Sequence, residues 1–400
     1  MRRLAPRRSL FAGRYSAALA KRAAEGTLRS TTVRTETLID FASNDYLGVA
    51  RDAAFAAAHF AAEARRADAA AGSTGSRLLT GASREHDAFE AFAAQFHERE
   101  SALLFGSGYA ANSAVAATLP LPSDTILYDE RSHNSTRFGL QRSRASRQIS
   151  WKHNDVDDLR VKLRDHDGAL VFVEGIYSMD GDEAPLLELA ELCLEDGRAG
   201  LIVDEAHSTG ILGDGGRGAV STLPAELRRA VVAQVHTFGK ALGGHGAVVV
   251  CDEITREYLA NYAQPFVYAT APPDSHSRLA RRAYEAVAAA DDARRHLARL
   301  IDLFRAECDV GSLLLPSRTP IQAVLAPGAD VVSRAADRVR RAGFDVGAIR
   351  APTVPAGAER LRLVLHAFNT EEEVLGVARA VREAVDASSS SPEDSERLVG

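Results

Sequence analysis

Short apolar segments alternate with helical stretches along most of this 400-residue chain, and this alternation limits the possible fold more than any other feature. The β-rich runs lie at residues 125–128, 169–174, 201–204, 231–237 and 247–251. Strands that alternate with helices in this way form βα units in a mostly parallel sheet buried on both faces. The sequence therefore predicts an α/β fold whose chemistry collects at the carboxyl ends of the strands.

The segments around this pattern divide the chain further. Residues 1–37 predict a basic helical arm, and residues 38–280 predict the large α/β domain that contains the alternation. A long Arg- and Ala-rich helix is expected over 277–307, where the chain leaves the sheet, and residues 281–386 predict a smaller α+β domain. The Ser-rich segment 387–400 is of low complexity and is expected to be disordered.

Composition excludes several classes of function. Forty-eight Lys and Arg against 54 Asp and Glu leave a net charge of -6, which gives no basic surface for nucleic acid or anionic membranes. The three cysteines have no disulfide, metal or redox spacing, which favours the reducing cytoplasm. The Arg-rich segment 1–21 has no acidic residue, so a mitochondrial targeting segment stays as an alternative to a basic arm.

Three familiar motifs lack the residues that would complete them. Residues 204–207 spell DEAH, but Gly239-Lys240 is not part of a phosphate loop, which argues against an ATPase. Asp204 and His207 alone are too few to hold a metal, and we expect no metal site. The turn at 106–111 fits G-x-G-x-x-A, so a dinucleotide-binding protein remains a rival from another class.

Lys240 is the most informative of the polar residues at the predicted strand ends. Glycines surround it in a loop directly after an apolar strand, and glycines permit close ligand approach. A lysine in a cleft with an acidic residue at a neighbouring strand end suits a Schiff base with pyridoxal phosphate, whose ring nitrogen Asp204 would keep protonated. The further candidates at these strand ends are His133, Glu174, Ser178, His207 and Thr237.

The chain resembles the α-oxoamine synthases, a family of fold-type-I pyridoxal phosphate enzymes that join an amino acid to an acyl thioester. The likeness extends from about residue 41 to residue 366, and it implies a large domain with a seven-stranded sheet and a smaller C-terminal domain. Several ordered matches make it specific. They are FASNDYLG (41–48), GSTGSRLLTG (72–81), SGYAAN (107–112), SHNS (132–135), EGIYSMDGD (174–182), VDEAHSTG (203–210), TFGKALG (237–243) and PTVPAGAERLRL (352–363).

The resemblance implies a role for each candidate residue toward the cofactor. Gly108, Tyr109 and Thr237 would hold the phosphate, His133 would stack on the ring, and Asp204 would pair with the ring nitrogen. The cofactor-binding set is completed by Glu174, Ser178, His207, Lys240 and Thr270. The residues implied to be catalytic are His133, Asp204, His207 and Lys240.

The same resemblance implies a substrate site and a homodimer. Asn44 and Arg362 would bind the amino-acid carboxylate, for which an arginine is suited, and Arg29 and Thr353 would contact substrate. His133 would touch substrate as well as cofactor. Thr270 would reach the phosphate of the partner subunit, so the two active sites would be shared.

The segment 349–357 is most similar to the branch of the family that serves biotin biosynthesis. That branch joins L-alanine to pimeloyl-CoA or pimeloyl-ACP and yields 8-amino-7-oxononanoate and CO2, and the amine of Lys240 would act as general base. Serine palmitoyltransferase, 5-aminolevulinate synthase, glycine C-acetyltransferase and another α-aminoketone synthase remain alternatives, whereas the presence of Lys240 argues against a non-catalytic subunit. Ala351 and His245 depart from the family pattern, which leaves the thioester and the role of His245 open.

Overall fold

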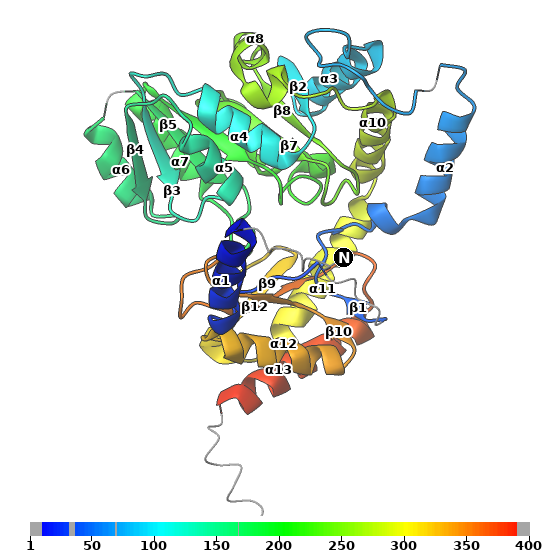
Figure 1. Ribbon diagram of the computed structural model, residues 1–400, viewed down its shortest axis with the longest axis vertical. Coiled ribbons are helices and arrows are strands. Elements are labelled where there is room, and N and C mark those ends of the chain that lie inside the picture. Colours follow the sequence, from blue (N-terminus) through cyan, green and yellow to red (C-terminus); the bar gives the residue numbers. More distant parts are fainter. Residues whose placement is uncertain (1–9, 32–36, 69, 167, 390–400) are drawn as a thin grey trace, which may run out of the picture.

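The computed structural model describes residues 10–31, 37–68, 70–166 and 168–389. Figure 1 shows a large unit built on a broad sheet and a small unit below it, connected through α10 and α11. The strands are β1 (Ile39–Asp40), β2 (Ser101–Phe105), β3 (Thr125–Asp129), β4 (Arg147–Trp151), β5 (Ala169–Glu174), β6 (Ala199–Asp204), β7 (Val231–Thr237), β8 (Ala247–Cys251), β9 (Ile321–Leu325), β10 (Phe344–Asp345), β11 (Gly347–Ile349) and β12 (Arg360–Val364).

The α-helices lie between these strands and before and after them. They are α1 (Leu10–Ala24), α2 (Ala53–Ala64), α3 (Arg84–Phe96), α4 (Gly108–Thr118), α5 (Asn134–Leu140), α6 (Val156–Arg164), α7 (Leu186–Asp196), α8 (Glu253–Tyr262), α9 (Gln264–Val267), α10 (Asp274–Ala288), α11 (Asp291–Glu307), α12 (Ala329–Arg341) and α13 (Glu371–Ser389). Within the described ranges no helix is both long and apolar enough to cross a membrane.

The large unit contains a seven-stranded sheet in the order β2-β8-β7-β6-β5-β3-β4. β8 runs antiparallel to both of its neighbours, and the strands from β7 to β4 are parallel. The predicted mostly parallel seven-stranded sheet is therefore confirmed. The short apolar runs become central strands because both faces of this sheet are covered.

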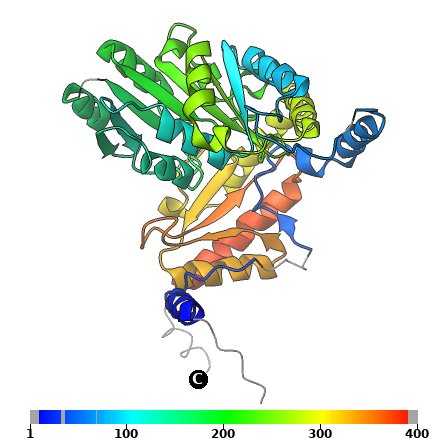
Figure 2. The ribbon, with the colours of Figure 1, turned by 45° about the horizontal axis from the view of Figure 1, so that its top comes forward.

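Helices cover both faces of the sheet, as Figure 2 shows. On one face α4 and α8 pack against β7 and β8 through small and aliphatic side chains such as Ala111, Val115 and Leu259. On the other face α6 and α7 contribute residues such as Leu159 and Leu189 to a second cluster. A sheet held between two apolar layers has a fixed edge at the carboxyl ends of its strands, and polar residues there can be positioned accurately.

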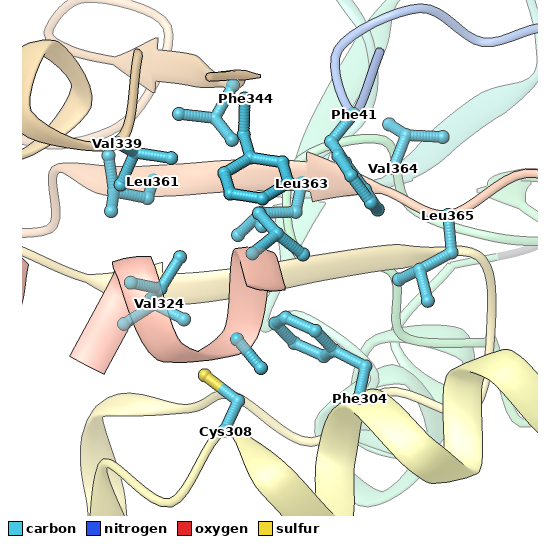
Figure 3. Close-up of a cluster of buried hydrophobic side chains, with 14 of the residues drawn as sticks. Phe41, Phe304, Cys308, Val324, Val339, Phe344, Leu361, Leu363, Val364 and Leu365 are labelled. Atoms are coloured by element: carbon cyan, nitrogen blue, oxygen red, sulfur yellow. The ribbon is translucent and has the colours of Figure 1, made fainter. Parts of the chain in front are cut away.

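The small unit is built on β9, β11 and β12, which form a three-stranded antiparallel sheet. Its core contains Phe304, Val339 and Leu363, which Figure 3 shows packed around β12 and the neighbouring helices. Phe41 belongs to the same cluster, and β1 pairs with β10. The segment 38–41 thus packs with the small unit, whereas the sequence placed it in the large domain, because its two-residue strand has its hydrogen-bond partner in β10.

Two further boundaries differ from the sequence-based expectation. The long helix expected over 277–307 is divided into α10 and α11, and Asp291 and Asp292 at the start of α11 favour a new helix N-terminus. The tail expected to be disordered from residue 387 begins as helix, since α13 extends to Ser389. The rest of that tail, 390–400, and residues 1–9 and 32–36 of the arm lie outside the described residues.

Candidate active site

The carboxyl ends of β5, β6 and β7 bring three of the expected site residues to one edge of the sheet. Glu174 is the register partner of Asp204, and Asp204 pairs with Val235, two residues before Thr237. All three polar side chains are buried. Lys240 follows Thr237 in the loop that leaves β7, so it lies at the same edge.

The surroundings of Lys240 lower the pKa of its ammonium group. Burial lowers the pKa of the Lys240 ammonium below its usual value, and Arg362 lowers it further. The negative charges of Asp204 and Glu174 oppose this shift without cancelling it. A lysine with a depressed pKa is a competent nucleophile toward a carbonyl group and a competent base, because its amine is available for reaction.

Asp204 is fixed by two hydrogen bonds at the end of β6. Asn112 on α4 donates to its Oδ2 at 2.6 Å, and the Ala206 amide donates to its Oδ1 at 2.9 Å. Asn112 also donates to Ser135 Oγ at 3.1 Å, which ties the site to α5. Burial and the adjacent Asp204 charge raise the pKa of Glu174 well above its usual value.

His133 is the N-cap of α5 and is oriented through its backbone and its ring. Its amide donates to Glu174 Oε1 at 2.6 Å, and its Nδ1 lies 2.7 Å from Ser135 Oγ. Partial burial lowers the pKa of the imidazole, and the positive charge of Lys240 acts in the same direction while Asp204 opposes it. His133 is nevertheless exposed to solvent. A residue that stacks on a planar ligand has to be accessible in the ligand-free protein.

The start of α4 forms a cradle suited to an anion. Amides in the first turn of a helix have no partner within the helix, and Ser107 Oγ accepts from Ala110, which leaves Gly108 and Tyr109 at the open end. A Cβ built on Gly108 would lie 2.9 Å from Thr237 Oγ1. The Thr237 hydroxyl and the first-turn amides therefore meet at one place, and a glycine is needed at position 108 for this approach.

Gly108→Ala should weaken phosphate binding at this cradle. Its Cβ would lie 2.9 Å from Thr237 Oγ1 and 3.1 Å from Thr237 Cβ, so the hydroxyl must shift. We expect the affinity for pyridoxal phosphate, titrated by fluorescence quenching, to fall roughly tenfold, the value of about one hydrogen bond to a charged group. Gly106→Ala is the matched control, because a Cβ at Gly106 meets no atom within 4 Å. Equal affinities for the two variants would contradict the cradle.

A second cluster joins the small unit to this edge of the sheet. Arg362 on β12 donates from Nε to the Ser178 carbonyl oxygen at 2.6 Å and from Nη2 to Asn44 Oδ1 at 3.0 Å. The Tyr46 hydroxyl and His207 Nδ1 are hydrogen-bonded at 2.5 Å. Burial lowers the pKa of His207 well below its usual value, so the ring is neutral. Asn44, Ser178, His207 and Arg362 are thus brought together.

The remaining expected residues lie elsewhere. Arg29 donates to Thr353 Oγ1 at 3.0 Å, and both side chains are exposed. Thr270 is also exposed and lines a cavity of about 240 Å³ together with Gly106 and His245. This cavity is different from the small one lined by Asp204 and Glu174, so the single chain does not bring Thr270 to the strand-end carboxylates.

Comparison with known proteins places this arrangement in a family. The family model for aminotransferase class I and II matches residues 36–381. An 8-amino-7-oxononanoate synthase from Halorhodospira halophila is 40% identical over 379 residues, covering 93% of this chain and 91% of the relative. The synthase of the same name from Emericella nidulans is 37% identical over 386 residues and covers 88% of this chain and 90% of its own length.

Solved structures with the same fold agree. A serine palmitoyltransferase from S. paucimobilis, determined with bound pyridoxal phosphate and myriocin, has a TM-score of 0.84 and 26% identity, covering 95% of this chain and 99% of that one. An 8-amino-7-oxononanoate synthase from Francisella tularensis has a TM-score of 0.73 and 29% identity, covering 88% and 98%. The chain therefore belongs to the aminotransferase class I and II family. Within it, the chain is an α-oxoamine synthase, a pyridoxal-phosphate-dependent acyltransferase.

The side chains at the strand ends fit pyridoxal phosphate. Lys240 supplies a partly buried amine with a lowered pKa, and Asp204 supplies a fixed carboxylate for a ring nitrogen. The Gly108 cradle with the Thr237 hydroxyl suits a phosphate, and the exposed surface of His133 offers a stacking face. The predicted cofactor and fold class are confirmed by the comparisons, and the individual residue roles stay predictions.

Sequence reasoning assigned no role to three residues that the structure places in the site. Asn112 and Ser135 form the hydrogen-bonded chain that holds Asp204, and Tyr46 holds His207. All three lie inside stretches that carried the family resemblance. Their contacts join residues that are 23 to 161 positions apart in the chain, which no local pattern reveals.

Proposed function

We propose that this chain condenses L-alanine with a pimeloyl thioester, either pimeloyl-CoA or pimeloyl-ACP, and releases CO2 and 8-amino-7-oxononanoate in biotin biosynthesis. The observation that carries the proposal is a partly buried Lys240 with a lowered pKa at the same sheet edge as a fixed Asp204, in a chain 37–40% identical to proteins named 8-amino-7-oxononanoate synthase. The buried Arg362 opposite them supplies the cation that an amino-acid carboxylate requires.

Each residue has a definite task in this reaction. Bound pyridoxal phosphate supplies the electron sink that makes the α-proton of an amino acid removable. Arg362 and Asn44 bind the substrate carboxylate, and Arg362 is kept in orientation by the Ser178 carbonyl. Asp204 would provide negative charge for the cofactor nitrogen, and His133 would stack on the ring.

Lys240 moves the protons. Its neutral amine takes the α-proton of the bound amino acid, whose α-carbon then attacks the thioester carbonyl and expels the thiol. The resulting β-keto acid loses CO2, and the Lys240 ammonium returns a proton to the same carbon. Burial lowers the pKa of Lys240, which increases the fraction of unprotonated amine that can take the α-proton.

Serine palmitoyltransferase activity is the second candidate, because solved serine palmitoyltransferases superimpose with TM-scores of 0.82 to 0.84. Their identity to this chain is 26–29%, against 37% and 40% for the 8-amino-7-oxononanoate synthases from Emericella nidulans and Halorhodospira halophila. The two functions use different amino acids and different acyl chains, so substrate panels separate them.

We expect turnover of L-alanine with pimeloyl-CoA to exceed turnover of glycine or L-serine by at least about 100-fold in kcat/KM, a difference of roughly 2.7 kcal/mol in transition-state binding. The measurement is thiol release with each of the three amino acids, and with pimeloyl-CoA and palmitoyl-CoA in turn. A preference for L-serine and palmitoyl-CoA would transfer the function to serine palmitoyltransferase. The fold and the role of Lys240 would stand in either case.

The proposal extends to a cytoplasmic homodimer with shared sites. Leu79 and Tyr268 are each 82% exposed, and Tyr268 lies two residues before the exposed Thr270. Large apolar side chains that are exposed in the single chain are typical of a surface that a second subunit covers. Such a subunit would bring its Thr270 toward the phosphate cradle. All three cysteines are free and buried, which suits a reducing compartment.

A further inference from the structure

His153 lies between two carboxylates from different segments of the chain. Its Nδ1 is 2.9 Å and 3.0 Å from the two oxygens of Asp129, at the end of β3. Its Nε2 is 2.6 Å from Asp182 Oδ2, in the loop that follows β5. Asn154 strengthens the same bridge, because its backbone amide donates to Asp129 and its side chain donates to Asp182.

This geometry requires a doubly protonated ring. Carboxylates only accept hydrogen bonds, so each ring nitrogen of His153 must carry a hydrogen, and a neutral imidazole has just one. Burial lowers the pKa of His153, but the hydrogen bonds to Asp129 and Asp182 outweigh burial and raise the pKa to about 9. The His153 side chain is 10% exposed, which protects the pair of ionic hydrogen bonds from solvent.

The two loops joined by His153 are the loops that carry substrate-site and cofactor-site residues. Asp129 also accepts from the Arg131 amide at 2.7 Å and begins the turn that leads to His133. The loop that contains Asp182 also contains Ser178, whose carbonyl oxygen accepts from Arg362 at 2.6 Å. A shift of one loop relative to the other would therefore separate the ring-stacking residue from the carboxylate-binding residue.

A second ionic bridge joins the same loops to the small unit. Asp180 pairs with Arg131 from the first loop and with Arg360 on β12. Arg360 and Arg362 are both on β12, so the bridge ends on the strand that carries the substrate-binding arginine. His153 and Asp180 thus fix three segments relative to one another.

We infer that His153 is a positioning residue for this reaction: as an imidazolium it clasps Asp129 and Asp182, and so holds His133 and Arg362 at the separation that the amino-acid substrate requires. The inference rests on the proposed function for the identity of that amino acid. His153 touches no reacting atom, and its effect acts through the two loops.

The first test compares His153→Asn with His166→Asn as the matched control. An asparagine amide can donate to one of the two carboxylates but is too short to join both, whereas His166 lies just beyond the end of α6 and contacts Arg147. We expect His153→Asn to raise the KM for L-alanine and lower kcat by about tenfold or more each, since misplacing a site by about 1 Å costs up to 100-fold. His166→Asn should match the wild-type enzyme.

The second test measures unfolding of the cofactor-free protein between pH 6 and pH 10, by urea titration. The titratable groups that face the His153 ring are Asp129 from β3 and Asp182 and Tyr177 from the loop after β5, and Glu130 accepts the backbone amide. Because the folded pKa of His153 is raised, its stabilisation is complete below about pH 6.5 and is lost as the pH rises through about 9. This alkaline loss should be smaller in His153→Asn than in the wild type.

Asp182→Asn keeps an oxygen for His153 Nε2 but removes the negative charge. It therefore tests the bridge from Asp129 through His153 to Asp182 even if His153→Asn does not fold. It should lower the pKa of His153 and move the alkaline loss of stability to lower pH. A wild-type KM in His153→Asn, or an alkaline loss that neither variant alters, would overturn the inference. If the wild-type enzyme turns over another amino acid instead of L-alanine, the proposed substrate is wrong. The same comparison of variants, made with that amino acid, still tests the positioning role of His153.

Discussion

Replacement of Lys240 by alanine should abolish turnover, lowering kcat by at least about 10³-fold. The expected loss is this large because, in the proposed reaction, one amine serves both as the attachment point of pyridoxal phosphate and as the base that moves the α-proton. The surroundings of Lys240 lower its pKa. A lysine on the surface, without such surroundings, would not take over its function. The measurement is kcat with L-alanine and pimeloyl-CoA, together with the visible absorption of the purified enzyme.

The absorption spectrum distinguishes this loss from unfolding. Lys240→Ala should still bind pyridoxal phosphate through the Gly108 cradle and Asp204, but the absorption of the lysine-bound cofactor should be replaced by that of the free aldehyde. Lys21→Ala is the matched control, because the Lys21 side chain on α1 is 76% exposed. A Lys240→Ala enzyme that kept both its activity and the lysine-bound absorption would contradict the assignment.

Asp204→Asn should have the second largest effect, a fall in kcat of about 10² to 10³-fold with little change in the KM for L-alanine. The substitution preserves size but removes the negative charge that we propose pairs with the cofactor nitrogen, and removing one fixed electrostatic partner costs about this much. The amide would also present hydrogens to Asn112, which now donates to Asp204 Oδ2 at 2.6 Å. Steady-state kinetics on the cofactor-saturated enzyme measures both parameters.

Asp165→Asn provides the comparison for this change, since Asp165 is exposed at the end of α6. It should retain wild-type kinetics and cofactor absorption. An Asp204→Asn enzyme with full kcat would show that the charge at the end of β6 is not used in catalysis. A raised KM for L-alanine with normal kcat would instead assign Asp204 to substrate binding.

The central strands of the sheet are predictable from the sequence because they have a strong local signal. β5 and β6 are short apolar runs that end in Glu174 and Asp204, so the local pattern predicts both the strands and their acidic ends. The same pattern does not predict β4, because an edge strand with mostly exposed residues carries no continuous apolar run. The local pattern also places β1 in the large domain, because the sequence of a two-residue strand does not indicate which strand it pairs with.

Local sequence patterns do not predict the long-range contacts within the site. The family resemblance supplies Asn44, Arg362 and His133 as candidates, and the structure brings each of them to the edge of the sheet or to the cluster opposite it. It does not supply the contact between Asn112 and Asp204, which joins residues 92 positions apart. His153 also escapes prediction, because its significance lies in the two carboxylates that meet its ring and not in its own position in the sequence.

Carboxyl-labelled L-alanine tests the central claim most directly. Incubated with the holoenzyme and pimeloyl-CoA, it should release labelled CO2 and one equivalent of CoA for each 8-amino-7-oxononanoate that mass spectrometry detects. The product itself should carry no label. CoA release without labelled CO2, or a product that retained the label, would contradict a decarboxylative condensation at this site.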